Sequence, residues 1–136
     1  MKKIPTTVWV VAAALVDGQG RVLMQRRKLG REHGGLWEFP GGKVEADETP
    51  GPSLCREIAE ELGLVIEAAD LVPVSFAARP DLPHVILLYR CGAWRGEPRC
   101  LDGEEIAWFP VEEVSGLEMP PLDVPLARAL RDLEKR

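Results

Sequence analysis

The chain of 136 residues is acidic, with 22 Asp and Glu residues against 17 Lys and Arg residues and a formal net charge of −5. Proteins that hold DNA or RNA through counterion release need a concentrated basic surface, so this balance argues against a nucleic-acid polymer as partner. The length is typical of one domain, which we expect to span residues 1–136, since no repeat or low-complexity linker divides the chain.

The cysteines and the N-terminal segment bear on the compartment. Cys55, Cys91 and Cys100 are odd in number and lack the spacing of a zinc site, so neither a disulfide framework nor a structural metal is indicated. The apolar run within residues 6–16 is too short to cross a bilayer and leads into a turn rather than a cleavage site. We therefore expect a buried strand there, no contact with a membrane and a cytoplasmic location.

The first part of the chain is predicted to form a β-hairpin and a short strand. Residues 6–16 are rich in Val, Ala and Trp, and residues 21–25 alternate in a way that would pair with them across a turn at residues 17–20. Residues 36–39 predict a further strand, which Pro40 and the two glycines after it stop.

A helix is predicted after this strand. Thr49 can cap its start, and Pro50 and Pro52 fall in its first turn, where a missing N–H is harmless. Gly63 supplies a left-handed stop at the other end.

The rest of the chain predicts strands at residues 71–78, 85–94 and 106–110 and a closing amphipathic helix at residues 124–135. Strands on either side of a helix, followed by a second helix, predict a mixed β-sheet sandwiched between α-helices in a single α/β domain.

The first helix carries carboxylates on one face. At about 100° per residue, Glu57, Glu60 and Glu61 fall within an arc of roughly 100°. Like charges this close repel one another unless a cation lies among them, and Mg²⁺, or Mn²⁺ in its place, takes oxygen ligands and leaves sites for phosphate oxygens. A merely solvated acidic face is the alternative. Gly41 and Gly42 before the helix favour the metal, because they let a main-chain carbonyl approach it.

The spacing of these residues also matches a known family signature. Its positions are Gly42, Glu48, Arg56, Glu57, Ile58, Glu60, Glu61, Gly63 and Leu64. This is the complete signature of the Nudix hydrolases, and the string LWEFPGGKVEADETP resembles their MutT-type members. The resemblance implies a Nudix fold and a metal-dependent attack of water on a nucleoside triphosphate, which gives the monophosphate and pyrophosphate. In the 8-oxo-dGTP diphosphatases this reaction cleans the nucleotide pool.

By matching position, the resemblance also implies roles for individual residues. Glu60 and Glu61 would bind the metal and Gly41 would offer its carbonyl. Glu57 would be a further ligand or the general base, and Arg56 would orient a neighbouring carboxylate. The residues expected to support the loop and the helix end are Gly42, Glu48 and Gly63.

A further ligand in this family comes from a loop six residues before a tryptophan that resembles Trp108. The residue at that position is Asp102, which is one carbon shorter than the Glu usual there. Asp102 would bind directly or through water, or Glu104 or Glu105 would replace it. A solvated acidic turn is the other possibility.

Substrate contacts are expected outside the signature. Arg27 and Lys43 match phosphate-binding positions of the MutT-type proteins, Arg26 does not, and Phe39 matches a position that lines the base pocket. Asp123 stands where relatives selective for 8-oxoguanine have Asn. An ionised Asp only accepts hydrogen bonds and suits the amine of cytosine or adenine, whereas burial that raised its pKa would let it serve an oxidised purine.

The alternatives left open concern the substrate. Trp37 is at least as readily a core aromatic as a base contact, and Pro83 lacks a main-chain N–H that a modified guanine would otherwise meet. A pyrophosphohydrolase for CTP or modified pyrimidines and an ADP-ribose-type diphosphatase, hinted at by Pro80, are the other enzymes. A non-catalytic Nudix-like binding module would have lost carboxylates that this chain keeps. We expect a monomer or a weak dimer with a nucleoside triphosphate as substrate.

Overall fold

The computed structural model describes residues 6–135, which form two sheets and the helices around them. The four-stranded sheet has the order β4-β1-β6-β5 and the three-stranded sheet the order β3-β2-β7. The strands are β1 (Val8–Leu15), β2 (Arg21–Arg26), β3 (Trp37–Glu38), β4 (Gly41–Lys43), β5 (Val72–Ala78), β6 (His84–Cys91) and β7 (Glu105–Pro110). The helices are α1 (Pro50–Leu62), α2 (Val111–Val114), α3 (Asp123–Glu134) and the single 3₁₀ turn η1 (Ala68–Asp70).

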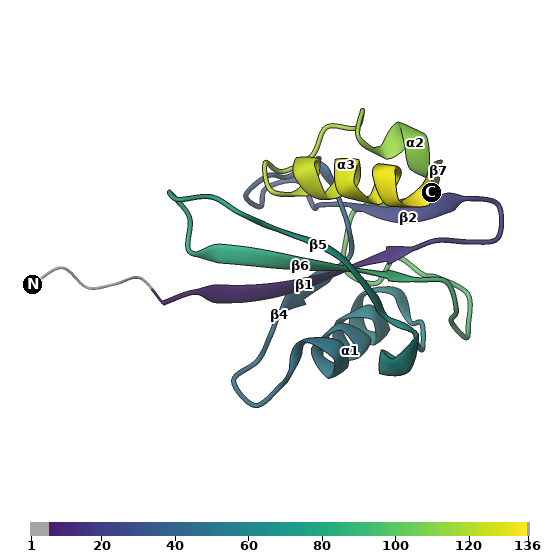
Figure 1. Ribbon diagram of the computed structural model, residues 1–136, viewed down its shortest axis with the longest axis horizontal. Coiled ribbons are helices and arrows are strands. Elements are labelled where there is room, and N and C mark those ends of the chain that lie inside the picture. Colours follow the sequence, from purple (N-terminus) through teal and green to yellow (C-terminus); the bar gives the residue numbers. More distant parts are fainter. Residues whose placement is uncertain (1–5, 136) are drawn as a thin grey trace, which may run out of the picture.

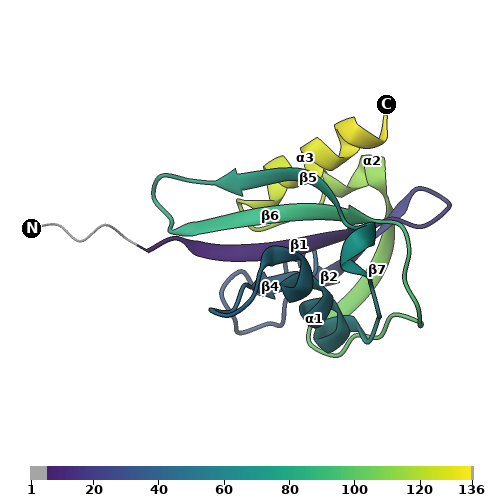
Figure 2. The ribbon, with the colours of Figure 1, turned by 60° about the horizontal axis from the view of Figure 1, so that its bottom comes forward.

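The four-stranded sheet is mixed and lies between helices, as predicted. β1 runs parallel to β6, whereas β4 and β5 run antiparallel to their neighbours. Figure 1 shows α1 and α3 on opposite sides of this sheet, and Figure 2 shows β5, β6 and β1 side by side. Within residues 6–135, no helix is long and apolar enough to cross a membrane.

From Val11 to Leu15, β1 is buried on both faces, which explains the continuous apolar run there. Val11, Ala13 and Leu15 point to a core that contains Leu54, Ile58 and Leu62 of α1. Their neighbours Ala12 and Ala14 point to a second core, which α3 covers. Side chains alternate between the faces of a strand, so one strand supplies both cores. The prediction of a buried strand here is confirmed.

The predicted hairpin is wrong. Asp17 does hold a tight turn, since its Oδ1 accepts the N–H groups of Gln19 and Arg21 at 2.9 Å each. The strands then diverge into different sheets and share only the single bridge between Val16 and Val22. β2 pairs instead with β3 and, along its whole length, with β7. The side chains of β2 enter both cores, Met24 on one face and Leu23 on the other. A distant pairing partner such as β7 leaves no local trace in the sequence.

The segment before α1 brings glycines against the central strand. Pro40 ends the predicted strand, but Gly41 and Gly42 do more than stop it, because they form β4 beside β1. A Cβ at Gly41 would come within 1.9 Å of the Val11 oxygen. Only glycine therefore allows this approach, which sets the start of the loop that leads to α1.

The remaining elements agree with the sequence within a few residues. α1 follows Thr49 and ends at Gly63, whose φ of 69° is left-handed, although the Thr49 side chain makes no capping hydrogen bond. The later strands and the closing helix are all present. The short elements β4, η1 and α2 are additions to the prediction.

Candidate active site

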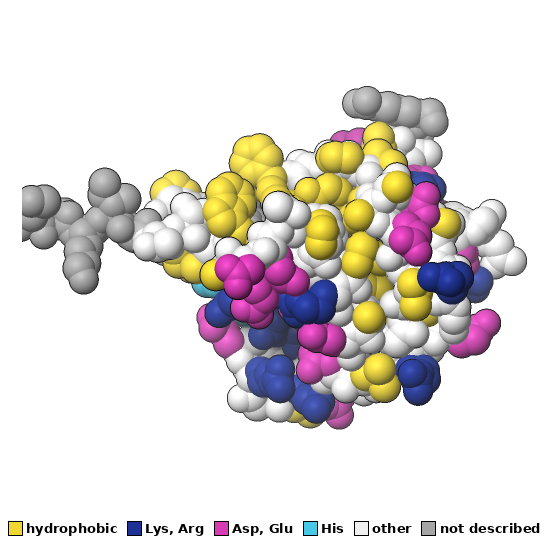
Figure 3. Space-filling view, turned by 90° about the horizontal axis from the view of Figure 1, so that it is seen from below, with side chains coloured by type: hydrophobic (Ala, Val, Ile, Leu, Met, Phe, Trp, Pro, Cys, Tyr) yellow, Lys and Arg dark blue, Asp and Glu magenta, His cyan; other side chains and the backbone are white. Residues whose placement is uncertain are grey.

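A cavity of about 530 Å³ opens where β1 and β4 meet α1, the loop of residues 27–33 and the segment 120–123. Most residues singled out from the sequence line it, namely Arg27, Phe39, Gly41, Gly42, Lys43, Glu57, Glu61, Asp102 and Asp123. Arg56, Glu48 and Glu60 are outside this lining, and Gly63 closes α1. On the face seen from the α1 side, acidic and basic side chains lie next to one another (Figure 3).

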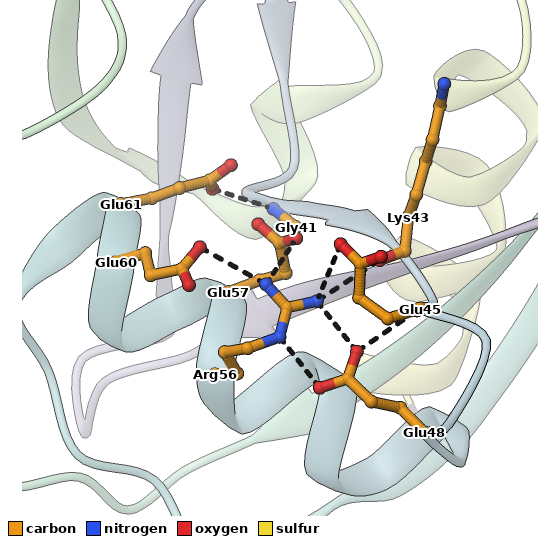
Figure 4. A network of polar contacts seen from close by, with 8 residues as sticks. All are labelled: Gly41, Lys43, Glu45, Glu48, Arg56, Glu57, Glu60 and Glu61. Carbon is orange, nitrogen blue, oxygen red and sulfur yellow. Dashed lines mark hydrogen bonds and ion pairs between the residues drawn. The ribbon is translucent and has the colours of Figure 1, made fainter.

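Arg56 joins the loop before α1 to the carboxylates of the helix. Its Nε and Nη2 donate to the two oxygens of Glu48 at 2.7 and 2.8 Å, and its Nη1 donates to Glu57 at 3.1 Å and Glu60 at 3.2 Å (Figure 4). Glu48 also accepts the N–H of Glu45 at 3.1 Å. The hydrogen bonds from Arg56 hold the pKa of Glu48 at about 2, and they raise the pKa of Arg56 above its usual range. Glu48 thus stays ionised and ties the loop to α1.

Two glutamates of α1, Glu57 and Glu61, line the cavity. Glu57 lies directly over Gly42, where a Cβ would come within 2.4 Å of its carboxyl carbon. Glu61 is only 8% exposed, and one of its oxygens accepts the N–H of Gly41 at 3.0 Å. Burial, followed by the charge of Glu57, raises the pKa of Glu61 to about 8, and burial also raises the pKa of Glu57. Gly41 thus meets the site through its N–H, and the metal contact expected of its carbonyl stays a prediction.

The donor set suits a hard cation, although it is arranged around Arg56. Among residues 6–135, no three acidic, His or Cys side chains stand close enough together to hold a metal ion as they are. The Arg56 guanidinium pairs with both Glu57 and Glu60, and Glu61 is turned toward Gly41. The room over Gly42 nevertheless admits a carboxylate, and Glu61 has no Lys or Arg partner in the described part of the chain. Carboxylate oxygens of this kind are what Mg²⁺ and Mn²⁺ take.

The acidic loop before Trp108 presents one carboxylate to the cavity. Asp102 lines it and lies near enough to Glu61 to contribute to its raised pKa. Glu105 instead pairs with Arg26 at 2.8 Å, and the N–H of Glu104 donates to the Arg26 oxygen at 2.8 Å. Of the three acidic candidates in this loop, the geometry favours Asp102.

The opposite end of the cavity is built around Asp123. This side chain is 5% exposed, and its Oδ2 accepts the Phe39 N–H at 3.2 Å. Burial, followed by the charge of Glu38, raises the pKa of Asp123 to about 7. Trp37 packs edge-on against Phe109, with ring centroids 5.0 Å apart, and is absent from the lining. Trp37 is therefore a packing residue, as one of the two interpretations had it.

The three basic residues considered in the sequence as phosphate contacts differ in their surroundings. Arg27 lines the cavity and donates from Nη1 to Glu38 at 3.0 Å and from Nε to the Glu32 oxygen at 2.9 Å. The Lys43 side chain points away from Arg56 and from the glutamates that Arg56 contacts (Figure 4). Arg26 lies over the Trp37 ring, 5.8 Å from its centroid, and is not part of the lining.

The family follows from a comparison with known protein domains, in which residues 6–133 match the NUDIX domain. The chain belongs to the Nudix family. The chain is 34% identical to the CTP pyrophosphohydrolase of Escherichia coli, over 90% of its own length and 91% of that protein. It is 40% identical to the putative 8-oxo-dGTP diphosphatase 2 of Mycobacterium tuberculosis, over 84% and 81%. The crystal structure of the MutT protein from Methanosarcina mazei has the same fold, with a TM-score of 0.82 at 20% identity, over 98% of this chain and all of that one.

Several residues of this Nudix cavity were missed in the sequence. Lys28, Arg31 and His33 follow Arg27 in its lining, and the basic string RRKLGREH was the signal that could have indicated them. Gln25 and Glu38 also line the cavity. They carried no signal, because their exposure to the cavity depends on which sheet β2 joins.

Proposed function

We propose that this Nudix hydrolase cleaves nucleoside triphosphates to the monophosphate and pyrophosphate with Mg²⁺, which Mn²⁺ can replace. The observation that carries the proposal is that the carboxylates of Glu57 and Glu61 line the cavity. Arg56, which donates to Glu48, also donates a hydrogen bond to Glu57 and so fixes its position. Glu57, Glu60, Glu61 and Asp102 would hold the ion. When bound, a divalent ion supplies polarisation of the phosphate oxygens and acidification of water.

The other steps belong to side chains of the chain itself. Glu57 would accept the proton of the attacking water, since it lines the cavity and burial raises the pKa of its carboxyl, which makes it a stronger base. Arg27 and Lys43 would bind phosphate oxygens, the first with its forked donor set and the second as a point charge. The base would lie against Phe39 and Asp123. The cytoplasm is the compartment we propose, since all three cysteines are free thiols, and a monomer or weak dimer is the proposed assembly.

For the base, we propose 8-oxo-dGTP as the preferred substrate. With a pKa of about 7, Asp123 is protonated in a large part of the molecules at neutral pH. A protonated carboxyl both donates and accepts, as the amide of Asn does, and this suits an oxidised purine. The ionised form only accepts, which favours the second candidate, CTP or a modified pyrimidine. The names of the two relatives support the two candidates equally.

A screen that measures release of the nucleoside monophosphate by liquid chromatography tests the proposal, because triphosphates and ADP-ribose both yield a monophosphate, whereas ADP-ribose yields no pyrophosphate. The four standard deoxynucleoside triphosphates, CTP, 8-oxo-dGTP and 5-methyl-dCTP are compared with ADP-ribose at pH 6 and pH 8.5, with Mg²⁺. We expect 8-oxo-dGTP to give the highest kcat/KM at pH 6. At pH 8.5, the kcat/KM of the pyrimidine nucleotides relative to that of 8-oxo-dGTP should be higher than at pH 6. Preference for ADP-ribose would reject the triphosphate substrate, and no turnover of any compound would reject hydrolysis in favour of a binding module.

A further inference from the structure

The cavity wall contains a buried polar side chain that the proposed mechanism does not use. Gln25 of β2 is only 2% exposed, and its Oε1 has no hydrogen-bond partner within residues 6–135. Buried acceptors in folded proteins are nearly always paired, because an unpaired one loses its contact with water and gains nothing. An orphaned oxygen in the wall of a cavity therefore points to a donor that the cavity holds when it is loaded.

The position of Gln25 identifies the end of the cavity concerned. Side chains two residues apart lie on the same face of a strand, and Leu23 belongs to the core beneath α1. Gln25 thus faces the α1 side, where Glu61 lies, whereas Met24 and Phe39 belong to the opposite core. The unpaired oxygen lies at the carboxylate end, away from the core that Phe39 joins.

The loop that contains Asp102 and Gly103 packs directly against the Gln25 side chain. A Cβ at Gly103 would come within 2.5 Å of the Gln25 Cγ and 2.9 Å of its Cδ. It would also come within 2.8 Å of the Arg26 oxygen. Glycine therefore lets the residue after Asp102 lie against Gln25, and both Gln25 and Asp102 line the cavity.

The two carboxylates at this end cannot donate to the Gln25 Oε1 once they are ionised, as they would be when they bind a metal. The carboxylates of Glu61 and Asp102 are acceptors, as is the Gln25 Oε1. A water molecule of a hydrated cation presents only its hydrogens outward and needs an acceptor. We propose that Gln25 is a positioning residue that accepts a hydrogen bond from such a water molecule at the Asp102 end of the metal site. This inference rests on the proposed metal site, and it explains how the short Asp102 side chain can serve there through water.

The test replaces Gln25 by Met, which has a similar volume and no hydrogen-bonding oxygen. Binding of Mn²⁺ without nucleotide is followed by electron paramagnetic resonance, and unfolding of the metal-free protein is followed by differential scanning fluorimetry. We expect Gln25→Met to weaken Mn²⁺ binding about tenfold, at the lower end of the loss caused by removing outer-sphere partners of metal sites. The metal-free Tm should stay equal or rise, because an unpaired buried oxygen is removed. If the Met variant does not fold, the same two measurements are made on Gln25→Leu.

The control is Gln19→Met in the exposed turn before β2, which should change neither quantity. Equal Mn²⁺ affinity in wild type and Gln25→Met overturns the inference, and so does a loss confined to nucleotide affinity. A lower metal-free Tm also overturns it, because Gln25 would then serve the fold. Wild-type protein that binds no Mn²⁺ would instead mean that the proposed metal site itself fails.

Discussion

The Arg56 guanidinium grips the Glu48 carboxylate with two parallel hydrogen bonds, Nε to Oε2 at 2.7 Å and Nη2 to Oε1 at 2.8 Å. Its remaining nitrogen reaches Glu57 and Glu60 on α1. One planar side chain thereby orients the loop before the helix and two carboxylates on it. This arrangement depends on the fork of donors that only Arg offers.

Arg56→Lys is therefore expected to impair the enzyme although the charge is kept. A Lys ammonium is a point charge and cannot hold Glu48 in two parallel bonds while also pairing with Glu57. We expect kcat to fall at least tenfold, since misplacing a catalytic group by about 1 Å has effects of this order or larger. The control is Arg95→Lys. The Arg95 side chain is exposed and pairs with Glu67 at 3.4 Å, and the variant should keep full activity.

Glu57→Gln should abolish nearly all Mg²⁺-dependent pyrophosphate release while leaving the fold intact. The amide is nearly the same size and can still accept a hydrogen bond from Arg56, but it cannot take a proton or offer a charge to a metal. Loss of a general base costs about 10²–10⁴-fold in rate. Circular dichroism checks the fold, and Glu112→Gln on the exposed part of α2 is the control. Retained turnover would contradict the role of Glu57 as general base.

Gly42→Ala should displace the Glu57 carboxylate from the cavity. The added Cβ would come within 2.4 Å of the Glu57 Cδ, closer than non-bonded atoms approach, so the side chain has to move. We expect activity to fall more steeply than stability. Gly18→Ala is the matched control, because no atom lies within 4 Å of a Cβ there, and it should behave as wild type. A crystal structure of Gly42→Ala with Glu57 unmoved would contradict this account.

Asp102→Ala and Glu104→Ala separate the acidic residues of one loop. Only Asp102 lines the cavity, whereas Glu104 is exposed. We expect Asp102→Ala to raise the Mg²⁺ concentration needed for half-maximal rate, and Glu104→Ala to leave it unchanged. A titration of activity against Mg²⁺ measures both. Equal effects in the two variants would show that the loop acts only through its net charge.

Asp123→Asn should stabilise the protein at alkaline pH and much less in acid. Asp123 has a pKa of about 7 in the folded protein and an ordinary value of 3.8, so the folded state holds its proton more tightly. The wild type consequently gains stability as the pH falls from about 7 toward 4, whereas the Asn variant has no such proton.

The free-energy difference between wild type and Asp123→Asn should shrink by about 3 kcal/mol between pH 8.5 and pH 5, because pH 5 lies about two units below the folded pKa and each unit is worth about 1.36 kcal/mol. Urea unfolding at both pH values measures it. The Asn oxygen can keep the hydrogen bond from the Phe39 N–H, so the packing should not change. A difference that does not vary with pH would mean that Asp123 is ionised throughout this range.

The residues of α1 were predictable because their relationships are local. The helix begins after Thr49 and ends at Gly63, and its carboxylates share one face, since helical geometry depends only on residues a few positions apart. The family signature adds the reaction type through the same short stretch. For this segment, the order of residues along the chain was sufficient to predict the helix and the reaction type.

Strand pairing was not predictable in the same way. The turn at Asp17 is local and was anticipated, yet β2 leaves β1 and pairs with β7. An alternating strand fits several partners, and the choice between them depends on which pairing buries both faces. The error at the hairpin also hid Gln25, because its side chain meets the cavity only in the sheet that β2 actually joins.

The chemistry of the cavity depends on the same long-range packing. A sequence specifies that residue 123 is Asp, but not that the fold buries its carboxyl and, together with the charge of Glu38, raises its pKa to about 7. Likewise, Asp102 and Glu104 are equivalent in composition, and only the fold turns one of them to the cavity. Local geometry thus specified the acidic helix and its family, whereas burial, which only the assembled sheets create, decided the protonation of Asp123 and the lining of the cavity.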